Sequence, residues 1–163
     1  MGLSDVSNIL WRERQLMELL LFKLEEEHLV LASGRERWLS HATREVETVL
    51  SEIKRVELDR SIAVESAAAE VGLGSQPTLK DLSEHATGPW TRIFDEHRKA
   101  LLELAGEIDT MAGANRELLA RGEKAARDAL IALGEVEGST NTYSPNGFSR
   151  EGIGRIGLVN EAI

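Results

Sequence analysis

Apolar residues recur along three long stretches of the chain at alternating steps of three and four residues. The clearest stretch begins at Trp90 and continues without a slip to Ala132. This alternation is typical of a helix that packs along one narrow seam against a partner helix. At 1.5 Å per residue such a helix is about 64 Å long, which favours an elongated bundle over a compact globule. Its predicted seam is Trp90, Phe94, His97, Leu101, Leu104, Ile108, Met111, Asn115, Leu118, Gly122, Ala125, Ala129 and Ala132.

Two helices with the same pattern are predicted before it, over residues 4–33 and 36–71. Between Leu16 and Leu24 the first helix is apolar over enough of its circumference to contact more than one neighbour. In the second seam Arg60 is the one charged member, and we expect its stem to pack while its head reaches water. The first seam is Val6, Leu10, Glu13, Met17, Leu20, Leu24, His28 and Leu31; the second is Leu39, Ala42, Val46, Val49, Ile53, Val56, Arg60, Ala63 and Ala67.

Glycine and proline mark the predicted boundaries. Ser33-Gly34 has the form of a helix C-cap, so we expect a tight reversal there. The alternative is one continuous helix, because the seven-residue repeat of apolar positions continues almost in phase across Ser33-Gly34. Residues 72–77 read as a linker. A capping box, Thr78 with Asp81, then opens a short helix over 78–86, and Thr87-Gly88-Pro89 precedes the long helix over 89–133.

The pattern changes after residue 133. Residues 134–163 are rich in Gly, Ser, Thr and Asn and have no sustained period, which predicts a flexible tail appended to a helical bundle of residues 1–133. Spaced apolar residues in this tail suit a segment that folds onto a partner; a plain solvated tail is the alternative. The predicted fold class is therefore all-α, an elongated antiparallel helical bundle or coiled-coil hairpin with a long third helix and a flexible C-terminal tail.

Composition narrows the choice of partner. The net charge is −9, which argues against nucleic acid and against anionic membrane surfaces. The chain has no cysteine, which excludes a disulfide frame and a thiolate metal site and fits a reducing compartment. The longest apolar run, Leu19 to Phe22, is too short to cross a bilayer. We expect a soluble cytoplasmic protein with no membrane insertion.

Three patterns suggest chemistry, and each has a simpler interpretation. Residues 152–157 fit G-x-G-x-x-G, but an all-helical segment precedes them where a dinucleotide site needs a strand. Glu25-x-x-His28 has the spacing of a carboxylate-bundle iron site, but no second such pair exists. His97 and Asn115 occupy seam positions, where polar residues more often fix register and partner choice. No catalytic residue, cofactor or metal is predicted.

Two stretches of the chain carry a family resemblance. The first comprises Leu20 to Leu29 (LLFKLEEEHL), Gly34, Trp38-Leu39, Thr43-Arg44-Glu45 and Val49-Leu50. The second comprises Asn115-Arg116-Glu117-Leu118-Leu119 and, after the last helix, Asn141-Thr142-Tyr143-Ser144-Pro145-Asn146-Gly147. Together, in this order and over nearly the whole chain, they resemble the FlgN family of flagellar export chaperones. The chain departs from the family pattern at Val46, where lysine is frequent.

The resemblance implies a bacterial chaperone that is not an enzyme. It holds flagellar hook-associated proteins by their C-terminal segments and delivers them to a component of the flagellar export gate. The resemblance places client binding in the C-terminal helix and tail, and the gate contact at Tyr143 with Asn146 and Gly147. The alanine-rich end of the long helix lacks large core residues of its own, so a client helix would supply them. The expected client-binding residues are Leu118, Leu119, Leu130, Leu133, Ile153, Ile156 and Val159.

Two other functions compete with this reading. One is a structural or secreted helical hairpin that self-associates through its own seams, so a homo-oligomer is a possible state. The other is a carboxylate-bundle enzyme, which rests on the single Glu25-x-x-His28 pattern. Co-purification of hook-associated proteins distinguishes the chaperone from the self-associating hairpin, and metal analysis tests the enzyme.

Overall fold

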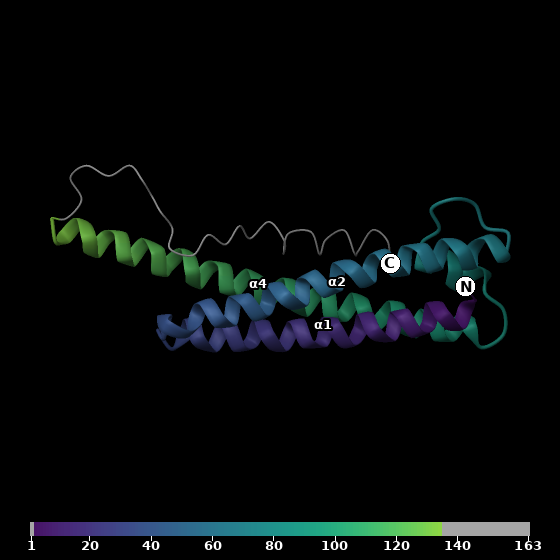
Figure 1. The fold of residues 1–163 in the computed structure, drawn as a ribbon, viewed down its shortest axis with the longest axis horizontal. Helices are drawn as coiled ribbons and strands as arrows, with labels where there is room; N and C mark the ends of the chain where they lie inside the picture. Colours follow the sequence, from purple (N-terminus) through teal and green to yellow (C-terminus); the bar gives the residue numbers. More distant parts are fainter. Residues whose placement is uncertain (1, 135–163) are drawn as a thin grey trace.

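Four helices make up the part of the chain that the computed structural model describes, residues 2–134 (Figure 1). Sequence periodicity placed them at about 4–33, 36–71, 78–86 and 89–133. They are α1 (Leu3–Ala32), α2 (Glu36–Glu70), α3 (Leu79–His85) and α4 (Trp90–Ala132). Within the described residues there is no strand, and the fold is all-α as predicted.

Side-chain contacts fix the direction of each helix. Arg60 of α2 reaches Glu13 of α1, so the two helices run antiparallel and the chain reverses at Ser33-Gly34. The reversal excludes the continuous helix, and Gly34 supplies the positive φ of 68° that the turn requires. Asn115 of α4 reaches α1 at Glu27, and His97 reaches it near the start of α1, so α1 and α4 are parallel.

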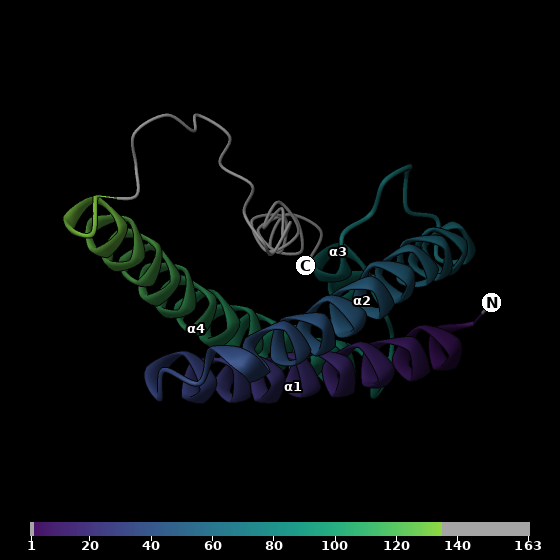
Figure 2. The same cartoon turned by 60° about the vertical axis from the view of Figure 1, so that its left-hand side comes forward.

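α1 lies between the other two long helices. It makes extensive contacts with both α2 and α4, whereas α2 and α4 contact each other little. Figure 2 shows these two helices diverging above α1. The predicted seams of α1 and α2 form the buried core, except that His28, Leu31 and Leu39 near the hairpin turn are only half-buried.

The seam of α4 differs from the prediction at its ends and in its middle. The predicted Trp90 and Leu118 are half-buried, and the predicted Gly122, Ala125, Ala129 and Ala132 are exposed. Ala105 and Ala112 are buried, whereas the predicted Leu104 and Met111 are half-buried at the edge of the interface. An α-helix has 3.6 residues per turn, so a strict 3.5-residue seam drifts around a straight helix. The small alanines allow the backbone of α4 to approach closely, and the two larger side chains cover the flank.

The wide apolar surface predicted on α1 is narrower in the structure. Leu19 is 41% exposed and Phe22 is 57% exposed, so neither side chain contributes to the contact with a second neighbour. Leu20 and Leu24 are fully buried, and Leu16 and Leu21 pack at the edge of the core. α1 contacts two helices through one continuous face and leaves its outer face uncovered.

The prediction for Arg60 was wrong. Its head does not reach water but donates to both carboxylate oxygens of Glu13, at 3.0 and 3.2 Å, and both side chains are buried. Burial raises the pKa of Glu13 to about 7, against the opposing effect of the Arg60 charge. The seam therefore contains a buried ion pair whose acid titrates near neutral pH.

The short helix α3 closes one end of the bundle. Its capping box is present as predicted: Asp81 accepts from the Thr78 backbone N–H at 2.8 Å, and the Thr78 hydroxyl accepts from the Asp81 backbone N–H at 3.1 Å. The Thr78 backbone N–H, and after it the Thr78 hydroxyl, lowers the pKa of Asp81 by donating to its carboxylate. Leu79 and Leu82 are buried in the same core as Phe94 of α4.

Candidate partner-binding surface

A polar layer ends the packed core near the hairpin turn. Asn115 is fully buried, and its amide nitrogen donates to the Leu24 carbonyl at 2.9 Å and to Glu27 Oε1 at 3.0 Å. His28 Nδ1 lies 2.9 Å from Asn115 Oδ1, which accepts its proton. All the hydrogen-bonding atoms of the amide are close to a partner, which a one-residue slip of α4 along α1 would prevent. This supports the expected role of Asn115 in fixing register.

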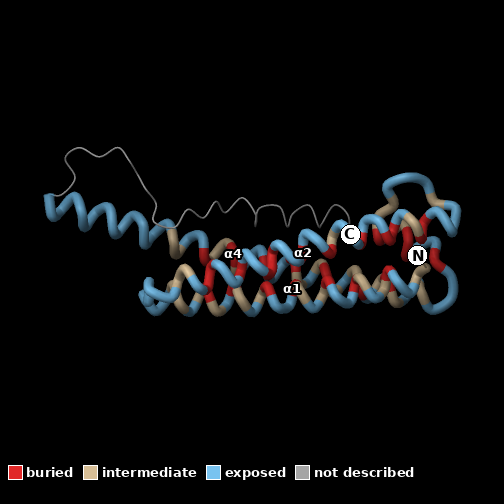
Figure 3. The backbone as a smooth tube through the Cα atoms, in the orientation of Figure 1, coloured by how far each residue is buried: buried red, intermediate tan, exposed pale blue. Residues whose placement is uncertain are grey.

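α4 continues past the end of α1, which lies shortly after this layer, without a helical neighbour. Because the contacts between α1 and α4 join residues offset by about 90, the end of α1 at Ala32 is level with about residue 121 of α4. Every described residue from 120 to 134 is exposed. Figures 1 and 3 show the end of α4 projecting past the hairpin turn. The segment from the polar layer to the last described residue, 116–134, is here called the overhang.

The buried face of α4 extends along the overhang as an apolar stripe. The core alanines at 105 and 112 are followed at seven-residue intervals by Leu119, Ala126 and Leu133. Leu130 lies one turn after Ala126 on the same face. This overhang stripe is defined by Leu119, Ala126, Leu130 and Leu133.

The predicted client-binding leucines are arranged unevenly on this surface. Leu119, Leu130 and Leu133 lie on the overhang stripe, where Leu130 is 43% and Leu133 is 72% exposed. Leu118 lies at its edge and, like Leu119, is half-buried. Sequence reasoning missed Ile131, which is 65% exposed but lies on a different face of the helix. Which face each leucine lies on follows from the 3.6-residue period of the helix and not from the 3.5-residue period of the predicted seam.

Charges on the overhang pair mainly along its own surface. Arg121 donates to Glu117, and Lys124 lies 2.7 Å from Asp128, each pair four residues apart. Asp95 and Lys99 form a pair with the same spacing nearer the start of α4. Glu123 and Arg127 have this spacing too, but they form no ion pair within residues 2–134. Glu123, four residues after Leu119 and three before Ala126, is the charged residue on the same face as the stripe.

The two candidate histidines have structural partners. His97 lies 3.2 Å from Ser7 Oγ, and Arg14 donates to its other ring nitrogen at 3.5 Å. Burial, and then the Arg14 charge, lowers the pKa of His97, which favours the neutral ring. Glu25 is exposed, while His28 faces Asn115. Residues 2–134 contain no group of three or more acidic or histidine side chains arranged to hold a metal ion.

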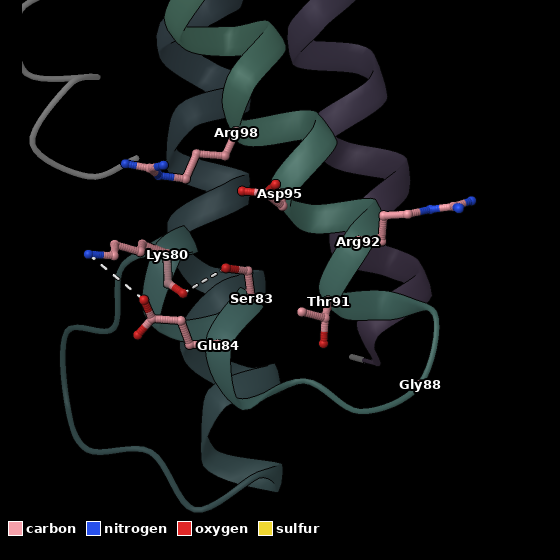
Figure 4. Close-up of a pocket in the computed structure, with 8 residues that line it drawn as sticks. All are labelled: Lys80, Ser83, Glu84, Gly88, Thr91, Arg92, Asp95 and Arg98. Atoms are coloured by element: carbon pink, nitrogen blue, oxygen red, sulfur yellow. Dashed lines mark hydrogen bonds and ion pairs between the residues drawn. The ribbon is translucent and has the colours of Figure 1, made fainter.

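A shallow pocket of about 390 Å³ lies between α3 and the start of α4. Figure 4 shows that Arg92 points away from Lys80 and Glu84. Lys80 lies 3.8 Å from Glu84, Arg92 pairs with Glu96, and Asp95 pairs with Lys99, so most of its charges are engaged along the helix surfaces. The pocket is lined by Lys80, Ser83, Glu84, Gly88, Thr91, Arg92, Asp95 and Arg98.

Six predicted functional residues lie outside the described part of the chain. They are the gate-contact residues Tyr143, Asn146 and Gly147 and the tail apolar residues Ile153, Ile156 and Val159. Among residues 2–134, none of the helices has the apolar length that a bilayer crossing requires.

An all-helical body with a projecting helix and an exposed apolar stripe defines a protein whose surface is suited to holding another chain. Comparison with known families matches residues 1–151 to the family described as FlgN protein. The chain belongs to the FlgN family, and membership implies a flagellar export chaperone that binds flagellar proteins. No curated protein and no solved structure matches the chain.

Proposed function

We propose that this chaperone binds flagellar hook-associated proteins in the cytoplasm and delivers them to the export gate. The overhang stripe forms the first part of the client-binding surface, with Leu118 at its edge. The tail residues Ile153, Ile156 and Val159 form the second part. The gate contact belongs to Tyr143, Asn146 and Gly147.

The observation that carries this proposal is the exposure of the overhang stripe. Within the bundle the same face of α4 is covered by α1, and it becomes uncovered only after the polar layer at Asn115. A client helix placed against Leu119, Leu130 and Leu133 would continue the helical packing beyond the hairpin turn. It would bury apolar surface at roughly 25 cal/mol per Å².

Substitutions on two faces of the overhang provide a test of the client surface. Leu130→Ser with Leu133→Ser removes two apolar side chains from the overhang stripe, and we expect client affinity to fall by about ten- to hundredfold. Ile131→Ser removes a side chain of intermediate exposure, 65% against 43% for Leu130 and 72% for Leu133, from a different face. It should change affinity less than about twofold. The measurement is isothermal titration calorimetry with a purified hook-associated protein. Equal losses for both variants would exclude the stripe as the binding face.

The gate contact is tested separately from client binding. Tyr143→Ala should leave client affinity unchanged while export of the hook-associated protein into the culture medium falls. Deletion of residues 135–163 should reduce both client affinity and export. Unchanged client affinity after this deletion would remove the tail from the client site and leave the overhang as the only part of it.

Self-association is the competing use of the same stripe. Sedimentation equilibrium of the purified chain distinguishes it: a dimer that Leu130→Ser with Leu133→Ser dissociates, together with no binding of hook-associated proteins, would favour the self-associating hairpin.

A further inference from the structure

A second exposed stripe runs along the outer face of α1, opposite its buried seam. Its members are spaced at seven, four, three and four residues, which places them on one side of a helix over five turns. Trp11 is 51%, Phe22 is 57% and Leu29 is 69% exposed. This outer stripe consists of Trp11, Glu18, Phe22, Glu25 and Leu29.

Two of its three apolar side chains carry a cation on the ring. The ring of Trp11 meets that of His97 edge-on at 5.0 Å, and the Arg14 guanidinium lies 4.3 Å from the Trp11 ring. The Lys23 ammonium lies 5.4 Å from the Phe22 ring. Large aromatic groups fixed in place before binding lose little conformational entropy in a complex, which is why such residues dominate binding energies.

The stripe is also acidic. Glu18 and Glu25 are exposed between the apolar residues, and neither has an ion-pair partner within residues 2–134. Glu26, which lies beside them, is 3.7 Å from Lys23, but Lys23 is 2.9 Å from Glu45 as well. The outer face of α1 therefore presents unpaired negative charge at the same positions along the helix as its exposed aromatic groups.

The exposed apolar groups and the unpaired carboxylates together favour one kind of partner. A second copy of α1 would bring Glu18 and Glu25 of both chains into one interface. Its cations there, Arg14 and Lys23, already lie on the Trp11 and Phe22 rings, and Lys23 also pairs with Glu45. An anionic lipid surface would repel the same carboxylates. A helix with apolar residues at heptad spacing and lysine or arginine beside them would bury the aromatic groups and pair both glutamates.

We propose that the outer stripe of α1 binds a basic amphipathic helix of another protein. The surface is separate from the overhang stripe, which lies on α4. The partner helix packs its apolar residues against Trp11, Phe22 and Leu29 and places cations beside Glu18 and Glu25. The chaperone can therefore hold two chains at once, one on each helix.

The test uses two synthetic helical peptides of about three heptads. Both carry leucine at the seam positions; one has lysine and the other glutamate at the flanking positions. Titration calorimetry with the full chain should detect binding of the lysine peptide and none of the glutamate peptide. Phe22→Ser with Leu29→Ser should weaken binding by at least about tenfold. Glu18→Lys with Glu25→Lys should reverse the preference between the two peptides.

Leu58 and Ile62 supply the matched control. They are 61% and 50% exposed on the outer face of α2, so Leu58→Ser with Ile62→Ser removes similar apolar area elsewhere. This variant should bind the lysine peptide as the wild type does. Equal effects of the two serine pairs, or equal binding of both peptides, would overturn the proposal. A dimer that Phe22→Ser with Leu29→Ser dissociates would assign the stripe to a second copy instead.

These outcomes do not depend on the proposed client site. Leu130→Ser with Leu133→Ser should leave binding of the lysine peptide unchanged. A loss of peptide binding in that variant would show that the overhang stripe, and not the outer stripe, holds the peptide.

Discussion

At the residue scale, the pairing of Glu13 with Arg60 is the contact with the largest expected effect on stability. Both side chains are buried, and the two hydrogen bonds join the first half of α1 to the second half of α2. A buried ion pair often adds little net stability, but removal of one partner leaves an isolated charge in the core.

Replacement of one or both partners separates these two effects. Arg60→Met should lower the free energy of unfolding by about 3 kcal/mol at pH 8. Without Arg60, Glu13 is either an unpaired buried charge or must take up a proton at a pH where a free carboxyl is ionised, and both cost free energy. Arg60→Met combined with Glu13→Met should recover most of the loss. Urea denaturation followed by circular dichroism measures both. A double variant as unstable as the single one would mean that the pair itself stabilises the bundle.

The raised pKa of Glu13 predicts the direction of a pH effect. The folded protein binds a proton at Glu13 up to about pH 7, whereas the unfolded chain releases it near 4.5. The contribution of Glu13 to stability is therefore complete below about pH 4.5 and is lost as pH rises through about 7, by up to about 3 kcal/mol. In Glu13→Gln this contribution is absent. The stability of the wild type relative to this variant should fall between pH 5 and pH 8.

At the element scale, the close approach of α4 to the core rests on its two buried alanines. Ala112→Leu should destabilise the protein by about 1–3 kcal/mol, because the added atoms push against packed neighbours. Met111→Leu, one residue earlier at the edge of the interface, should change stability by less than about 1 kcal/mol. Thermal unfolding of the two variants tests the assignment. A larger loss at position 111 would restore the seam predicted from the sequence.

The contrast between Met111 and Ala112 shows how far sequence periodicity specifies the fold. It predicted the helices, their seams in α1 and α2, and the α3 capping box, because these depend on local spacing and side-chain chemistry. It did not predict Ala105 and Ala112 in place of their larger neighbours, since that depends on how far α4 rotates relative to α1. The partner of Arg60 was missed because Glu13 is distant in sequence, although both had been placed in seams.

The functional surfaces were predicted to different degrees. The small glycine and alanine side chains at the end of α4 indicated a helix face without a packing partner. The exposed Leu130 and Leu133 lie on this face. The outer stripe of α1 was not found, because Leu19 and Phe22 were read as part of a wide core. Exposure, which decides between core and binding surface, depends on which helices pack around α1.

At the scale of the whole molecule, the offset between the helices divides α4 into a packed part and a free part. Backbone amides between Phe94 and Asn115 should exchange with solvent deuterium slowly, at rates set by global unfolding. Amides of the overhang after residue 120 should exchange much faster in the free protein, because no tertiary packing supports that part of the helix. Bound client should slow their exchange.

Hydrogen exchange followed by mass spectrometry measures both segments in one experiment. Ile131→Ser serves as the control, since it should not alter the slowing by client. Slow exchange along the whole of α4 in the monomeric free protein would mean that another part of the chain covers the overhang.

The parallel course of α1 and α4 has a practical consequence for how the protein is handled. The N-terminus lies at the α3 end of the molecule, and the overhang projects from the opposite end (Figure 1). A purification tag, fluorescent label or surface attachment joined before α1 therefore sits about 40–60 Å along α4 from the residues of the overhang stripe. Sensor-chip immobilisation through the N-terminus leaves that face open to a dissolved analyte, whereas attachment through an engineered cysteine near residue 126 would block it.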